Sequence, residues 1–278
     1  MGVECLASTP ILTLLSYFLV KVGLSWTCRP GLSTMGSDTS FHPEGQKPMI
    51  PLRDDNPTTI PPIVTVALIG ACALVFLWQL SLGAAGFNQL VYSLGVIPAA
   101  LLSEAELPPE LVLVPEKFTV ITSMFLHGGW MHLIGNMLYL WIFGNNVEDS
   151  MGHGRFVAFY LLCGAVAALG QAMINPGSEI PMIGASGAIS GVLGAYLLLY
   201  PHARVLVFLP MGILSQMIPL PAVWVLGFWI IFQILNSMVG GGAQGGVAWF
   251  AHIGGFVAGM ALIPFFKYRH VPLFHPHR

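Results

Sequence analysis

The chain has 278 residues, of which 55% are hydrophobic and only 8% are charged. A soluble domain carries about 25% charged residues, so this composition excludes an ordinary water-soluble enzyme and indicates a polytopic membrane protein. The net charge of −2, without a basic tail or patch, argues against nucleic acid as a partner. The four cysteines are scattered and form no CxxC pair, so neither a disulfide framework nor a zinc site is predicted.

The first 57 residues differ in composition from the rest of the chain. They hold one apolar run, Pro10–Val20, which is shorter than the ~20 residues that a membrane span needs. A signal peptide fits poorly, because Glu4 lies where a basic region is expected. We therefore expect either a largely disordered cytoplasmic extension or a mis-assigned start, with Met49 as the alternative. The expected organisation is an extension 1–57, a membrane domain 58–270 and a short cytoplasmic tail 271–278.

The apolar runs from Pro61 onward predict six transmembrane helices and therefore an all-α fold. These runs are Pro61–Leu82, Met131–Val147, Arg155–Ile174, Ser186–Tyr200, Leu220–Val239 and Ala248–Phe266. About 20 apolar residues are enough to cross a bilayer as a helix. The fourth run reaches only ~22 Å at 1.5 Å per residue, so one of its ends is expected beneath the membrane surface. The long external loop 83–118 is predicted to be structured.

The basic residues predict the orientation of the chain. Six of the seven Lys and Arg residues after Met49 fall on one side of a six-span arrangement, and only Lys117 falls on the other. Because cytoplasmic loops carry the excess of Lys and Arg, both termini are predicted to be cytoplasmic. We expect a multi-pass protein of the bacterial inner membrane whose functional site faces the outer side.

A few polar side chains interrupt the spans. Span two carries His132 and Asn136, span four opens with Ser186, and span six carries His252 near its start. Because these spans all run from outside to inside, the four side chains are expected at one depth in the outer half of the bilayer. Polar groups in hydrocarbon are costly, so they indicate a functional site.

The chemistry that suits these groups is acyl transfer. A serine hydroxyl becomes a nucleophile when a base within hydrogen-bond reach takes its proton, and His252 is the natural base for Ser186. Spans four and six contain no Asp or Glu, so a Ser–His dyad is predicted. The free N–H groups at the start of span four can stabilise an oxyanion. His132 and Asn136 lie one helical turn apart and can donate to the same oxygen.

Glycines predict how the two dyad helices meet. Gly187 and Gly191 lie four apart in span four, and Gly255 and Gly259 lie four apart in span six. Small residues at this spacing let helix backbones approach closely. If the two glycine faces meet, they bring Ser186 and His252 together.

Each motif alone is more often structural than catalytic. A GxSG sequence in a glycine-rich helix commonly serves packing, a lone histidine can be a packing residue or a proton relay, and Asn136 can link helices for ~0.6 kcal/mol. A small-solute transporter would show internal repeats, and none is seen. The chain has no HExxH motif, which argues against a zinc protease. Trp224, Phe228 and Trp229 are expected to face lipid or the interface, and His153 is expected in a loop.

Three motifs resemble the rhomboid proteases. His127-Gly-Gly-Trp-Met-His132-Leu-Ile-Gly-Asn136 resembles their HxxxxHxxxN element, Gly184-Ala185-Ser186-Gly187 their GxSG, and Ala251-His252-Ile253-Gly254-Gly255 their AHxxG. The resemblance covers about Met49 to Phe266. It implies a six-helix rhomboid-like bundle that needs no cofactor and no metal, and that cleaves single-span membrane protein substrates within the lipid bilayer. It also implies that span five and the loop 239–247 form a substrate gate and cap.

The resemblance assigns a role to each matching residue. Ser186 is the nucleophile, His252 the base, His132 and Asn136 oxyanion donors, and His127 their support. The structural positions are Gly184, Gly187, Gly255, Gly259 and Glu148. Some relatives place a tyrosine against the base four residues after the nucleophile, where this chain has Ser190, whose hydroxyl can instead hydrogen-bond to the ring. The alternative is a catalytically inactive rhomboid-like protein that binds membrane clients, but such relatives usually lack the Ser or the His.

Overall fold

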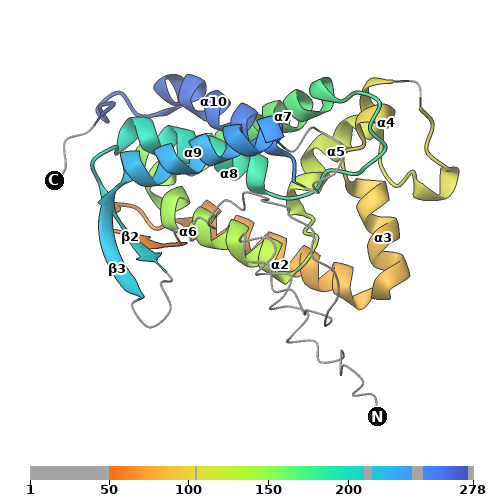
Figure 1. Cartoon of the computed structure of the whole chain (residues 1–278), viewed down its shortest axis with the longest axis horizontal. Coiled ribbons are helices and arrows are strands. Elements are labelled where there is room, and N and C mark those ends of the chain that lie inside the picture. The colour runs from red at the N-terminus through yellow and green to blue at the C-terminus, as the bar shows by residue number, and fades with distance from the viewer. Residues whose placement is uncertain (1–49, 104, 210–214, 240–246, 275–278) are drawn as a thin grey trace, which may run out of the picture. The chain divides into compact units, whose positions relative to one another are not determined.

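The computed structural model describes residues 50–103, 105–209, 215–239 and 247–274, and it is mostly helical. Six helices match the six predicted spans to within four residues at every end, which confirms the all-α membrane fold (Figure 1). These helices are α2 (Ile63–Ser81), α6 (Trp130–Met151), α7 (His153–Ile174), α8 (Ser186–Leu199), α9 (Ala222–Val239) and α10 (Trp249–Phe266). The loop 239–247, the expected cap, lies mostly outside the described residues.

The helices differ in how strongly their composition marks them as membrane spans. Among the described residues, α2, α7 and α10 are each long and apolar enough to cross a membrane. Helices α8 and α9 are shorter apolar helices, and α6 has the same length as α7 but carries several polar residues. These features are consistent with the predicted six spans.

The long loop after the first span is structured, as predicted. It contains α3 (Gly83–Leu94), α4 (Pro98–Leu102), the 3-10 turn η1 (Pro109–Leu111) and α5 (Glu116–Thr122), and a second 3-10 turn, η2 (Ser123–Phe125), leads towards α6.

A three-stranded sheet was not predicted. Its strands lie in the order β1 (Ile50–Asp54), β2 (Arg204–Leu209) and β3 (Gln216–Pro221). Strand β1 belongs to the last part of the expected extension 1–57, whose first 49 residues lie outside the described part of the chain. Strand β3 also moves the start of the fifth predicted span from Leu220 to Ala222.

The chain divides into two compact units. One unit combines Pro51–Leu206 with Pro219–Arg278 and contains every helix named above. The other combines Met1–Ile50 with Val207–Ile218, and its described residues are parts of the three strands and Ser215. The site described below lies entirely within the first unit.

Helix α8 is the central helix of the bundle. Ten of its 14 residues are buried, and it packs against α6, α7, α9 and α10 (Figure 1). Added Cβ atoms at Gly255 and Gly259 of α10 would collide with the backbone carbonyls of Gly187 and Gly191 of α8. The predicted meeting of the two glycine faces is therefore confirmed, because only a hydrogen side chain permits this backbone approach.

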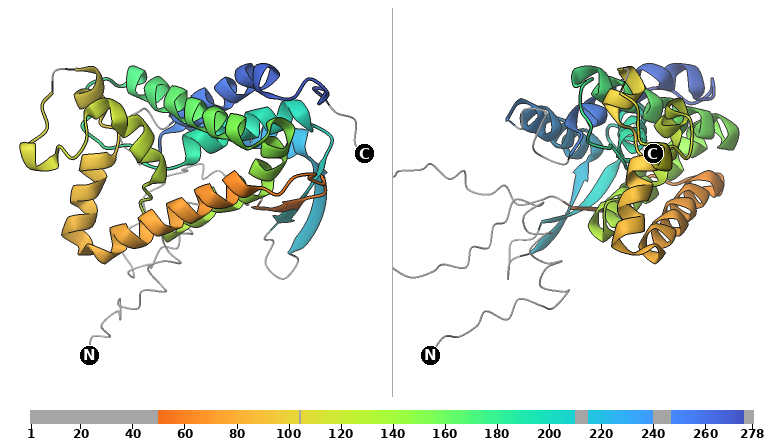
Figure 2. Two further views of the ribbon diagram at one scale, coloured as in Figure 1. Left: turned by 180° about the vertical axis from the view of Figure 1, so that it is seen from behind. Right: turned by 90° about the vertical axis from the view of Figure 1, so that its right-hand side faces the viewer.

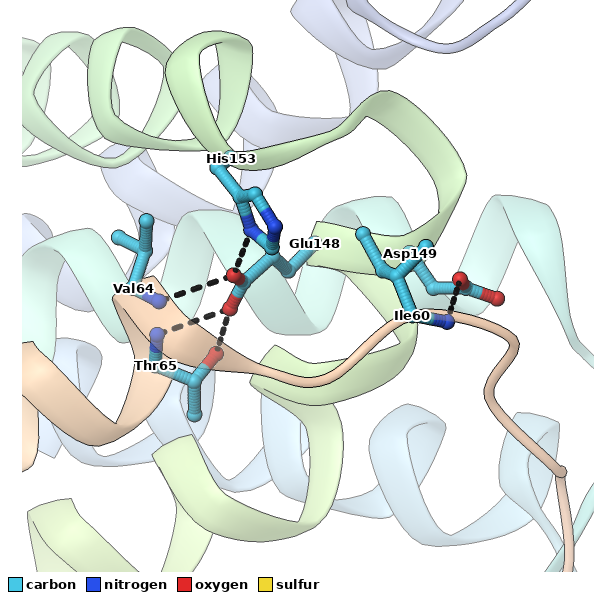
Figure 3. A network of polar contacts seen from close by, with 6 residues as sticks. All are labelled: Ile60, Val64, Thr65, Glu148, Asp149 and His153. Carbon is cyan, nitrogen blue, oxygen red and sulfur yellow. Dashed lines mark hydrogen bonds and ion pairs between the residues drawn. The ribbon is translucent and has the colours of Figure 1, made fainter.

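Glu148, near the end of α6, binds the start of α2 (Figure 3). Its carboxylate is fully buried and accepts hydrogen bonds from the N–H groups of Val64 at 2.9 Å and Thr65 at 2.8 Å, and from the Thr65 hydroxyl at 2.7 Å. His153 Nδ1 lies 2.6 Å from the same carboxylate. The first N–H groups of a helix lack intrahelical partners, so Glu148 of α6 caps the start of α2.

The neighbouring Asp149 extends this cap along the segment before α2. Its side chain accepts hydrogen bonds from the Thr59 hydroxyl at 2.6 Å and from the Ile60 N–H at 3.0 Å. Nearby, Asn146 Nδ2 donates to the Asn56 carbonyl at 2.8 Å. These contacts fasten α2 beside α6, and the two helices run side by side in the view from behind (Figure 2).

Candidate active site

Ser186 and His252 contact each other, as the motif order predicted. Ser186 is the first residue of α8, His252 lies in the first turn of α10, and Ser186 Oγ is 2.8 Å from His252 Nε2. Both residues are only partly buried, so small molecules can reach the pair. On α7, Gln171 accepts a hydrogen bond from the Ala251 N–H at 3.2 Å, which fixes the start of α10 next to the serine.

The chain enters α8 through a turn that needs glycine. Gly184 has φ +122°, in the region that residues with a Cβ atom rarely adopt, and its N–H donates to the Ser123 carbonyl at 2.8 Å. No side chain caps the start of α8. The N–H groups of the first turn of α8, including that of Ser186, therefore remain available to a negatively charged oxygen.

Ser190 was expected, as one possibility, to hydrogen-bond to the imidazole, but its hydroxyl has another partner in the described structure. Its hydroxyl donates instead to the Ser186 carbonyl at 2.6 Å, one turn earlier in α8. This bond steadies the backbone of Ser186 and leaves the ring of His252 to other contacts.

His132 and Asn136 of α6 converge on the turn before Ser186. The Gly128 N–H donates to His132 Nδ1 at 3.2 Å, so the proton of the neutral ring lies on Nε2. A Cβ atom built on Gly184 would lie 2.6 Å from His132 Nε2 and 3.7 Å from Asn136 Nδ2. Both donors therefore lie close to Gly184, and the His132 ring fills the place that a side chain at Gly184 would take.

Asn136 Nδ2 is buried and has no hydrogen-bond partner among the described residues. A buried polar donor without a partner costs about 1–3 kcal/mol, so such groups are rare and need an explanation. A negatively charged oxygen bound next to Ser186 would provide the missing partner.

His127 lies behind His132. Its ring is fully buried, packs edge-on against the His132 ring with 5.1 Å between centroids, and has its Nδ1 3.2 Å from the Phe125 carbonyl. Gln79 of α2 accepts a hydrogen bond from the His127 N–H at 3.0 Å. Burial lowers the pKa of His127 to about 4 against the opposing effect of the Phe125 carbonyl, so its ring is neutral at pH 7 and supports His132 by packing.

Gln233 of α9 was not predicted as a site residue. Its Oε1 lies 2.8 Å from His252 Nδ1, on the side of the ring opposite Ser186. A polar side chain in the middle of an apolar span was the available signal. Trp229 was expected to face lipid or the interface; its side chain is half-buried, and its ring also lies 5.9 Å from that of His252 between centroids. Trp224 and Phe228 are exposed on the outside of the bundle, as expected.

A cavity opens beside Ser186 on the side of α7. Small residues contribute much of its lining, including Ser123, Ala167, Gly184 and Ala251. It offers room for a water molecule or a small side chain next to the serine hydroxyl. Within the described ranges, no group of three or more His, Cys, Asp or Glu residues is placed to hold a metal ion.

Comparison with known proteins agrees with this geometry. The Rhomboid domain family model matches residues 115–269, more than half of the chain. Rhomboid protein 1, mitochondrial, from Saccharomyces cerevisiae is 32% identical over 156 residues, which are 53% of this chain and 41% of that protein. Rhomboid protease GluP from Bacillus subtilis is 42% identical over 82 residues, 30% of this chain and 16% of that protein.

A third relative is the presenilin-associated rhomboid-like protein, mitochondrial, from Bos taurus. It is 34% identical over 95 residues, 33% of this chain and 25% of that protein. The chain thus spans less than half the length of each of these relatives. Because several relatives are mitochondrial by name, the expected bacterial inner membrane is not supported. The match to the family model, which includes Ser186, His252, His132 and Asn136, shows that this integral membrane protein belongs to the rhomboid family.

Proposed function

We propose that the protein is a serine endopeptidase that hydrolyses peptide bonds of other membrane proteins within the bilayer. The observation that carries the proposal is the 2.8 Å contact between Ser186 Oγ and His252 Nε2. A hydroxyl within hydrogen-bond reach of an imidazole is the minimum arrangement for nucleophilic acyl transfer. The dyad lies in a chain whose composition excludes a soluble protease.

In the first half of the reaction, Ser186 Oγ attacks the carbonyl carbon of the scissile bond, and His252 Nε2 takes the hydroxyl proton. The tetrahedral intermediate collapses as the C–N bond breaks, and the protonated His252 gives its proton to the leaving amine. The product is an acyl-enzyme with the substrate's carbonyl carbon bonded to Ser186 Oγ.

The negative charge of the intermediate develops on the carbonyl oxygen. We assign three donors to this oxygen: His132 Nε2–H and Asn136 Nδ2–H, which lie near Gly184, and the backbone N–H of Ser186 at the uncapped start of α8. Donors that are fixed before the reaction cost no reorganisation when the charge forms. This role explains why a buried amide of Asn136 is left without a partner in the described structure.

In the second half, a water molecule attacks the acyl-enzyme. His252 takes a proton from the water and returns a proton to Ser186 Oγ as the ester bond breaks, which releases the new carboxyl terminus. The cavity beside Ser186, with its small lining residues, is a suitable place for this water.

We further propose that the substrates are single-span membrane proteins cleaved near small residues in helix-weak segments. A segment must unwind to present its backbone to Ser186, and weakly helical sequences unwind at the lowest cost. The excess of Lys and Arg on one side of the spans favours cytoplasmic termini and a dyad in the outer half of the bilayer.

Paired variants test the proposal in liposomes that contain the full chain and a model single-span substrate. We expect the wild type to cleave the substrate, and we expect neither Ser186→Ala nor His252→Ala to cleave it. Ser81→Ala is a matched control, because this exposed serine at the end of α2 bonds only within its own helix, to Trp78 O at 2.7 Å. A fluorophosphonate probe should label the wild type and Ser81→Ala but not Ser186→Ala.

Two outcomes would overturn the proposal. Cleavage that survives in either dyad variant would assign the chemistry to other residues. A wild type that binds a client but neither cleaves a panel of substrates nor reacts with the probe would identify a catalytically inactive rhomboid-like protein.

A further inference from the structure

Both ring nitrogens of His252 are engaged, and they contact different helices. Nε2 contacts Ser186 of α8, whereas Nδ1 contacts the side-chain oxygen of Gln233 of α9, each at 2.8 Å. His252 itself belongs to α10. The base therefore bridges two neighbouring helices, and one of its two bonds serves no step of the dyad mechanism described above.

The Gln233 contact determines where the ring proton lies. An amide oxygen only accepts hydrogen bonds, so Nδ1 of His252 must carry the proton that it shares with Gln233 Oε1. The amide cannot be turned around without loss, because Gln233 Nε2 donates to the Trp229 carbonyl at 3.4 Å. A reversed amide would bring its oxygen against that carbonyl oxygen.

This proton position leaves the lone pair of His252 on Nε2, directed at the Ser186 hydroxyl. The other neutral tautomer would direct an N–H at the hydroxyl and could not take its proton. In serine and cysteine proteases with a third member, a carboxylate or an amide performs the same task at the corresponding nitrogen. Here the amide comes from a helix that contributes neither the nucleophile nor the base.

The burial pattern of α9 shows that Gln233 faces the inside of the bundle. Its side chain is only 4% exposed, while the apolar neighbours Phe232, Ile234 and Leu235 are 41–54% exposed. In a membrane helix, a polar side chain that faces inward must find a partner, because lipid offers none. The inward partner of Gln233 is the imidazole of His252.

Two tryptophan rings also lie next to the imidazole of His252. Trp229 lies one turn before Gln233, with its centroid 5.9 Å from the imidazole, and Trp249 lies 6.2 Å away in an edge-on arrangement. Ser190, at the position where some relatives stack a tyrosine, bonds to its own helix. Apart from the bond to Ser186, the contacts that fix the ring therefore come from α9 and the start of α10.

We propose that Gln233 is a positioning residue that holds His252 in its Nδ1–H tautomer and thereby aims the base at Ser186. This inference rests on the proposed protease function. It predicts that the acceptor oxygen of Gln233 matters for the chemical step, and that its packing volume matters only for stability.

Three substitutions separate these effects. Gln233→Met keeps the length of the side chain but removes the acceptor, and we expect kcat to fall about 10- to 100-fold with little change in KM, as for a misaligned catalytic group. Gln233→Glu retains an acceptor oxygen and should rescue most of this loss. Asn236→Leu is the matched control, because this partly exposed amide of the same helix bonds to Phe232 O at 2.7 Å and its loss should leave kcat unchanged.

The rate of labelling by the fluorophosphonate probe should follow kcat, since the probe needs an aimed base but no substrate recognition. An unchanged kcat and labelling rate in Gln233→Met would overturn the inference while leaving the protease function intact. A wild type that neither cleaves nor labels would instead refute the proposed function itself.

A measurement on the wild type covers the case in which Gln233→Met fails to fold. Nitrogen NMR of isotope-labelled histidines, with His252→Ala to assign the signal, reports which ring nitrogen carries the proton. The inference requires protonated Nδ1 and unprotonated Nε2. The opposite tautomer would refute it.

Discussion

Two polar clusters lie on helix α6 and differ in how their hydrogen bonds are satisfied. Near the end of the helix, Glu148 is fully buried and accepts three hydrogen bonds from the start of α2. Near its beginning, Asn136 Nδ2 is buried without a partner among the described residues. Polar groups that stabilise a fold have their partners in the fold, whereas groups that stabilise a transition state wait for a partner that arrives with the substrate. The same helix shows both cases.

The largest effect on stability is expected from Glu148→Ala. This change leaves two N–H groups at the start of α2 and the Thr65 hydroxyl buried without an acceptor, which should cost about 3–5 kcal/mol. Thermal unfolding in detergent measures the loss, and the exposed Glu179→Ala is the control. Molecules that remain folded should keep their kcat. An unfolding midpoint equal to that of the control would refute the cap.

In contrast to Glu148→Ala, Asn136→Ala is expected to lower kcat and not stability. Loss of one oxyanion donor should lower kcat about 10²- to 10³-fold, while the unfolding midpoint stays the same or rises because an unpaired buried donor is removed. Asn146→Ala is the matched control on the same helix, since it removes a bond to Asn56 O at 2.8 Å. It should lower stability and leave kcat unchanged. Equal losses of kcat in both variants would contradict the assignment of a catalytic role to Asn136 and a structural role to Asn146.

The smallest effect concerns Asp54, whose carboxylate accepts a hydrogen bond from Tyr196 at the far end of α8 at 2.6 Å. Burial raises the pKa of Asp54 from 3.8 to about 6, against the opposing effect of the Tyr196 hydroxyl. The folded state therefore holds the proton more tightly, and stability decreases as the pH rises from about 4 to 6.

Asp54→Asn keeps the acceptor for Tyr196 and removes this charge. We expect its unfolding midpoint to exceed that of the wild type at pH 7.5, and the difference to shrink towards pH 4. The exposed neighbour Asp55 provides the control Asp55→Asn. A difference that does not depend on pH would show that ionised Asp54 is tolerated without cost.

The sequence predicted the six main helices because each coincides with an apolar run, and it predicted the contact of Ser186 with His252 because three spans of one direction carry the motifs. It did not predict the sheet. The strand Arg204–Leu209 follows a buried helix with only a short turn between, and an apolar run of this length has no unique period. The partners of Glu148 at the start of α2 were also beyond reach, because they lie 83 and 84 residues away in the chain and include two backbone N–H groups.

Gln233 was missed for a different reason. It has no neighbour in sequence that completes a motif, and its partner lies 19 residues away on another helix. A polar residue in an apolar span predicts that some partner exists, but only the packing of α9 against α10 identifies that partner as His252. The same packing brings the half-buried ring of Trp229 next to the imidazole.

The positive φ of Gly184 has an evolutionary consequence. An alanine there would be strained, and its methyl group would collide with the ring of His132, 2.6 Å from Nε2, so that this proposed oxyanion donor would have to move. One substitution would thus displace a proposed oxyanion donor while both members of the dyad stay intact. An inactive relative could therefore keep both the serine and the histidine. A search for lost activity among the relatives should also check whether glycine is kept at the position of Gly184.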